Sequence, residues 1–72
     1  MALILPFNNI RPKISDSAFI ADDVHVIGDV EIGEEANIWF GSVVRGDVSY
    51  IRIGARTNIQ DMTMIHVSSD FG

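Results

Sequence analysis

Aliphatic residues recur along this sequence at every sixth position. Two runs of isoleucine and valine keep that step: Ile14, Ile20, Val26, Ile32, Ile38 and Val44, followed by Ile53, Ile59 and Ile65. Four residues after each of these anchors stands a small or β-branched residue: Ala18, Val24, Val30, Ala36, Ser42 and Val48, then Thr57, Thr63 and Ser69. A period of six is neither the 3.6 of an α-helix nor the 2 of a single strand. It therefore predicts a short strand and a corner that repeat.

The repeat predicts an all-β fold, a parallel β-helix in which three hexapeptides, about 18 residues, form one triangular coil. Residues 14–72 would then form about three coils, and residues 1–13 an N-terminal strand or cap. Composition supports this, because isoleucine and valine together number 18 (11 + 7) against two leucines, and β-branched residues favour strands. A small meander of hairpins is the alternative, although the chain has no Asn-Gly or Asp-Gly turn.

One step in the series is too long. Val44 and Ile53 are nine residues apart, which is six plus three, so segment 45–52 is predicted to carry an insertion at one corner of the coil. Insertions in repeat proteins form loops, and loops often carry functional residues. We therefore expect the chemistry of this protein to lie near that corner.

Charge and composition narrow the classes of function. The chain has ten acidic residues, five basic residues and no cysteine, and its net charge is −5. Such a chain lacks the basic surface that binds nucleic acids or anionic membranes, so we expect neither partner. The absence of cysteine excludes disulfides and cysteine-ligated metals. The apolar run 2–7 has no basic residue before it and contains Pro6, so we expect no signal peptide and a cytoplasmic location.

Polar residues that could carry chemistry stand in and after the insertion. A residue next to an inward anchor points outward. Arg45 follows Val44 and His66 follows Ile65 one coil later, so we expect His66 to stack on Arg45 at one strand spacing, about 4.8 Å. Gln60, flanked by Asn58 and Asp61, is expected on the adjoining face near the shared edge. The candidate site, which can then gather along one side of the prism, comprises Arg45, Asp47, Asn58, Gln60, Asp61 and His66.

Segment 37–66 resembles the γ-class carbonic anhydrases, a family of left-handed β-helix proteins that also includes ferripyochelin-binding and hexapeptide-transferase-like proteins. The similarity rests on Arg45-Gly46-Asp47, on the stretch Asn-Ile-Gln-Asp at 58–61 and on His66 five residues later. The earlier repeats, residues 14–36, resemble the first coils of that family.

The resemblance implies a role for each candidate residue. His66 matches the first of three histidines that hold a catalytic zinc, or sometimes iron, ion, and Gln60 matches the residue that orients the metal-bound hydroxide. The resemblance also implies a pair that links subunits and shapes the site, and two members of the same hydrogen-bond network: Arg45 with Asp47, and Asn58 with Asp61. Members of the family act as homotrimers that convert carbon dioxide to bicarbonate. Three neutral imidazoles and an open position lower the pKa of zinc-bound water to about 7.

The sequence departs from that family in its histidines. The family's other two ligands and its C-terminal helix lie in later parts of the chain, and this sequence ends at Gly72. His25, the other histidine present, is expected to stand too far from His66 to replace them. We therefore expect the 72 residues to be the N-terminal, inactive part of a longer enzyme. Two alternatives stay open: a hexapeptide-repeat acyltransferase, and a β-helical scaffold or binding module without catalysis.

Overall fold

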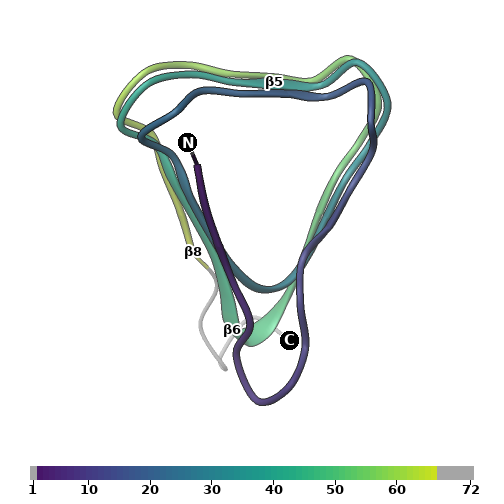
Figure 1. Cartoon of the computed structure of the whole chain (residues 1–72), viewed down its shortest axis with the longest axis vertical. Helices are drawn as coiled ribbons and strands as arrows, with labels where there is room; N and C mark the ends of the chain where they lie inside the picture. The colour runs from purple at the N-terminus through teal and green to yellow at the C-terminus, as the bar shows by residue number, and fades with distance from the viewer. Residues whose placement is uncertain (1, 67–72) are drawn as a thin grey trace.

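The computed structural model describes residues 2–66, and every regular element in that range is a β-strand. The chain winds around a triangle, with one strand or part of a strand along each side (Figure 1). The eight strands are β1 (Leu3–Leu5), β2 (Lys13–Ile14), β3 (Phe19–Ile20), β4 (His25–Ile32), β5 (Asn37–Ile38), β6 (Val43–Ile53), β7 (Asn58–Ile59) and β8 (Met64–His66). Residues 2–66 contain no helix that could cross a membrane.

All pairings between these strands are parallel. One sheet has the order β1-β4-β6-β8, with β2 also paired to β4, and a second sheet has the order β3-β5-β7. Strands β4 and β6 are long enough to pass around a corner, so the first sheet covers two sides of the triangle and the second covers the third (Figure 1). This arrangement confirms the predicted parallel β-helix of about three coils.

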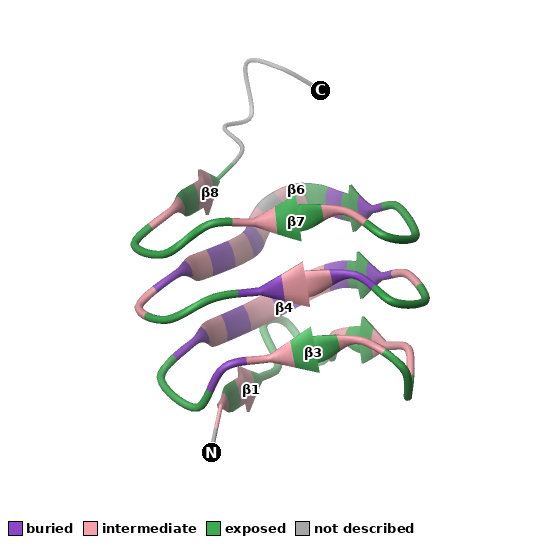
Figure 2. Ribbon diagram, turned by 90° about the horizontal axis from the view of Figure 1, so that it is seen from above, coloured by how far each residue is buried: buried purple, intermediate pink, exposed green. Residues whose placement is uncertain are grey.

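The six-residue anchors form vertical columns inside the triangle. Three sets of anchors stand in register: Ile14, Ile32 and Ile53; Ile20, Ile38 and Ile59; Val26, Val44 and Ile65. Val26, Ile38 and Val44 of the middle coils are fully buried, whereas Ile59 and Ile65 of the last coil are only half-buried (Figure 2). Burial of these aliphatic side chains is the main driving force for the fold.

The insertion lies where the long step predicted it, and the structure narrows it to residues 47–50. Gly28 pairs with Gly46, a separation of 18 residues, and Val30 pairs with Ile51, a separation of 21. Four residues of β6 therefore stand opposite Asp29 alone, which makes three extra residues (4 − 1). We call residues 47–50 the inserted corner.

The register corrects one detail of the sequence pattern. Counting by sixes assigned Val48 to the second inward column, but Ile51 is the residue in register with Val30, and it is 6% exposed. The pattern erred because the three extra residues come between Gly46 and Ile51, before this core position, whereas counting by sixes kept the frame as far as Val48. Ser69 of the same column lies outside the described residues.

Candidate functional site

Three of the candidate residues, Arg45, Asp47 and His66, form a polar cluster on β6 and β8, which we call the 45–47–66 cluster. Arg45 and His66 stand in register on neighbouring strands, which confirms the predicted stacking. The Asp47 carboxylate lies between them, with Oδ2 3.3 Å from Nε of Arg45 and Oδ1 3.4 Å from Nε2 of His66. The cluster therefore links two coils through one carboxylate.

The geometry of the cluster is that of ion pairing more than of aligned hydrogen bonds. The Nε atom of Arg45 is buried and has no hydrogen-bond partner in the described part of the chain, although the Asp47 carboxylate is within ion-pair distance. The side chains of Asp47 and His66 are 21% and 33% exposed. The partial burial of Asp47 reduces the solvent screening of its ion pair with Arg45 compared with that of a fully exposed pair.

The other three candidates lie on or next to the other sheet. Asn58 is the first residue of β7, where it stands in register with Asn37, and Gln60 and Asp61 follow β7 at the next corner. All three are exposed. Within residues 2–66, no hydrogen bond or ion pair joins their side chains to the 45–47–66 cluster, so one chain carries the six candidates as two separate groups.

The main-chain carbonyl of Gln60 is held by hydroxyl groups of the preceding coil and of its own corner. Its carbonyl oxygen accepts a hydrogen bond from Oγ of Ser42 at 2.7 Å and another from Oγ1 of Thr63 at 2.7 Å. Ser42 is fully buried, and its Oγ also accepts the N–H of Thr63 at 3.2 Å. Sequence reasoning assigned Ser42 only a packing role, because a small side chain in a repeat column does not reveal which main-chain groups its hydroxyl meets.

The described residues do not form a complete metal site. No group of three or more His, Cys, Asp or Glu side chains within residues 2–66 could hold a metal ion. His25 begins β4, two strands away from His66 in the same sheet, and two strand spacings are about 9.6 Å. His25 stands in the same row as Val43 and Met64, so it does not stack in register with His66.

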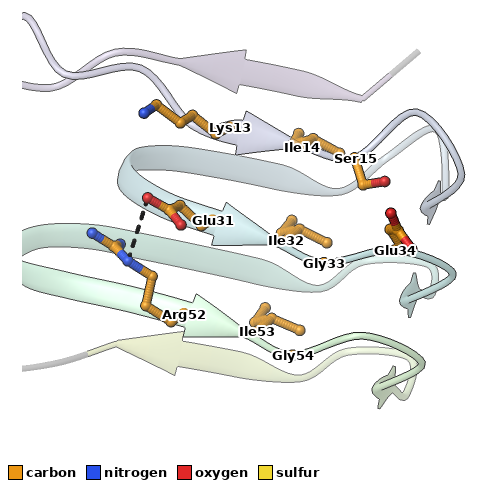
Figure 3. Close-up of a pocket in the computed structure, with 10 residues that line it drawn as sticks. All are labelled: Lys13, Ile14, Ser15, Glu31, Ile32, Gly33, Glu34, Arg52, Ile53 and Gly54. Atoms are coloured by element: carbon orange, nitrogen blue, oxygen red, sulfur yellow. Dashed lines mark ion pairs between the residues drawn. The ribbon is translucent and has the colours of Figure 1, made fainter.

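Two hollows lie on the surface of the described residues. A cavity of about 310 Å³ adjoins the cluster, between the loop around Phe7–Ile10 and the inserted corner, and Asp47 forms part of its wall. A larger groove of about 580 Å³ runs across three coils on another side of the triangle (Figure 3). Neither Arg45 nor His66 lines this groove, so it is not part of the candidate site although it is the larger of the two hollows.

Comparison with known proteins adds three similarities. Residues 11–46 match the family model described as bacterial transferase hexapeptide (six repeats). The chain is 53% identical over 66 residues to a protein of Geobacillus kaustophilus named carbonic anhydrase, covering 92% of the chain and 36% of that relative. It is 49% identical over 57 residues to gamma carbonic anhydrase 2, mitochondrial, of Arabidopsis thaliana, covering 79% of the chain and 20% of that protein.

A solved structure shares the fold. The crystal structure of a hexapeptide transferase family protein from Anaplasma phagocytophilum matches with a TM-score of 0.85 and 47% identity, over 86% of this chain and 37% of that one. The chain spans 36–39% of the length of the bacterial relatives that it matches.

Proposed function

This chain belongs to the bacterial transferase hexapeptide family, and we propose that it forms the first coils of a γ-carbonic-anhydrase-like lyase. The proposed reaction of the whole protein is the reversible hydration of carbon dioxide to bicarbonate. The observation that carries the proposal is the contact of Asp47 with both Arg45 and His66. Relatives named carbonic anhydrase, at about half identity over most of this chain, support it.

Each residue of the cluster has a role in this proposal. His66 would supply one imidazole ligand to a zinc or iron ion, and Asp47 would hold that ring in place, because ligating histidines usually contact a carboxylate through their other side. Arg45 would fix the Asp47 carboxylate and neutralise its charge. The described residues do not supply enough ligands to hold a zinc or iron ion. Further ligands must come from residues that the structure does not describe.

The separation of the candidates into two groups supports a site completed by a neighbouring subunit. Asn58, Gln60 and Asp61 project near one side of the triangle, and the 45–47–66 cluster lies on another. In a homotrimer, which we propose as the assembly, two different sides of neighbouring prisms can meet. Gln60 would orient the attacking oxygen, and Asn58 and Asp61 would hold Gln60 within a hydrogen-bond network. We place the assembled protein in the cytoplasm.

A chimera tests the proposal directly. Residues 1–72 would replace the matching part of the Geobacillus kaustophilus carbonic anhydrase, which supplies the remainder of the chain. We expect the chimera to bind metal and hydrate carbon dioxide, and H66A to lose both while its circular dichroism stays unchanged. H25A is the matched control and should keep metal and activity. A folded trimeric chimera that binds no metal would refute the assignment of His66.

The family description and the Anaplasma phagocytophilum structure favour a second candidate, acyl transfer. The same chimera distinguishes the two. Acetyl transfer from acetyl coenzyme A without carbon dioxide hydration would favour the transferase, and absence of both in a metal-loaded, folded chimera would favour a scaffold.

A further inference from the structure

Arg52 ties together the two sides of the inserted corner. Its Nη1 atom donates to the carbonyl oxygen of Ile51 at 3.0 Å and to the carbonyl oxygen of Asp29 at 3.2 Å, and it pairs with Oδ1 of Asp29 at 3.0 Å. Ile51 is the residue at which the register resumes, and Asp29 is the residue left opposite the insertion. One guanidinium nitrogen thus bridges the main chain on both sides of the register shift.

The rest of the Arg52 side chain holds the corner from outside. Its guanidinium carbon lies 4.8 Å from the ring centroid of Tyr50, a cation–π distance, and Tyr50 is the last residue of the inserted corner. Nε of Arg52 also pairs with Oε2 of Glu31 at 3.6 Å, and Figure 3 shows these two side chains pointing toward one another across neighbouring strands. Glu31 stands in register with Arg52, so this contact joins two regular strands and does not involve residues of the inserted corner.

The inserted corner begins with Asp47, the residue that contacts both Arg45 and His66. Extra residues in a corner add conformations that the repeat does not constrain, because no neighbouring coil has residues in register with them. The direction in which Asp47 points therefore depends on contacts that fix the far end of the same corner. Arg52 makes such contacts, with the Tyr50 ring at the end of the corner and with the carbonyl oxygens of Ile51 and Asp29 beside it.

We infer that Arg52 is a positioning residue, which fixes the inserted corner so that the Asp47 carboxylate stands against His66. The importance of this contact for catalysis rests on the proposed function, but the positioning itself does not require it. Asp29 and Glu31 form a matched pair that separates two effects of Arg52, its contact with the inserted corner and its contact between two regular strands. Both carboxylates pair with it, yet only Asp29 lies at the corner.

Nuclear magnetic resonance of the metal-free 72-residue chain, with a chelator present, tests the inference. D47N serves as the reference, because it removes the carboxylate charge beside the His66 ring and should shift its signals. We expect R52Q and D29N to shift the His66 ring signals in the same direction as D47N, and E31Q to leave them in place. R52K should restore part of the wild-type position. The ring of His25, on a different strand, is the internal control.

Three outcomes would overturn the inference. They are His66 signals that stay in place in R52Q while D47N moves them, equal shifts for D29N and E31Q, and no shift in D47N. If R52Q fails to fold, Y50L keeps the test open, since it removes only an exposed ring that covers Arg52. A double-mutant cycle of R52Q with D47N should show coupling on the order of fivefold in the unfolding equilibrium constant, against none with D23N at another corner. None of these measurements depends on metal or carbon dioxide, so the proposed function can fail without affecting them.

Discussion

Replacing Ser42 by alanine is expected to loosen the last coil, because one buried hydroxyl serves two main-chain groups of the coil above. The change removes the bond from Oγ to the carbonyl of Gln60 and the bond from the N–H of Thr63 to Oγ. Each neutral hydrogen bond contributes about 0.5–1.5 kcal/mol net, so the loss should be about 1–3 kcal/mol. The cavity term is small, because only one oxygen atom is removed.

Urea unfolding followed by the fluorescence of Trp39, the single tryptophan, would measure this loss. S15A is the matched control. Among the described residues, the Ser15 hydroxyl is bonded to the exposed hydroxyl and N–H of Ser17, and we expect its loss to cost less than about 0.5 kcal/mol. Thr63→Val should cost about half as much as Ser42→Ala, because it removes one bond to the Gln60 carbonyl. Equal midpoints for S42A and S15A would refute the reasoning.

Three further outcomes follow from the packing of the coils. Gly28→Ala should prevent or strongly weaken folding, because φ of Gly28 is +82° and an added Cβ would meet the Gly46 carbonyl oxygen. Gly54→Ala should be tolerated, because its Cβ would meet a side-chain oxygen at 3.8 Å. Thermal melts of the two variants test this difference. Ile38→Ala should cost about 2–5 kcal/mol and Ile59→Ala clearly less, since the first is fully buried and the second half-buried; equal losses in urea would contradict the burial difference. The chain should self-associate in light scattering, because in the described residues β7 and β8 each end a sheet with an unpaired edge, and a stable monomer at high concentration would count against this.

Much of the fold could be predicted because the repeat is local. A step of six residues places an aliphatic side chain inside at each turn of the chain, and three such steps close one coil, so the columns and the stacking of His66 on Arg45 followed from counting. The same counting located the insertion within 45–52. Within residues 2–66, counting failed inside that segment, where Ile51 is the residue in register with Val30.

The candidate site could be predicted only in part. The order of residues placed Arg45 and His66 together and Gln60 on the adjoining face, as the structure has them, but the expected gathering of Asn58, Gln60 and Asp61 with that pair is absent from the described part of one chain. A triangular coil turns sharply between neighbouring segments, so residues close in sequence can face different sides. The roles of Arg52 and Ser42 were missed for a related reason, since each also bonds to main-chain atoms, and no residue pattern encodes those contacts.

The sequence by itself determined the repeat, its period, the all-strand coil and the position of the break, because each is a property of spacing along the chain. Tertiary structure alone decided how the break is accommodated. Three extra residues could be accommodated at several points of segment 45–52. Their position depends on the close approach of Gly28 and Gly46 and on the contacts of Arg52 with Asp29 and Ile51. That choice directs Asp47 toward His66, because a carboxylate in an insertion is placed by the contacts that hold the insertion.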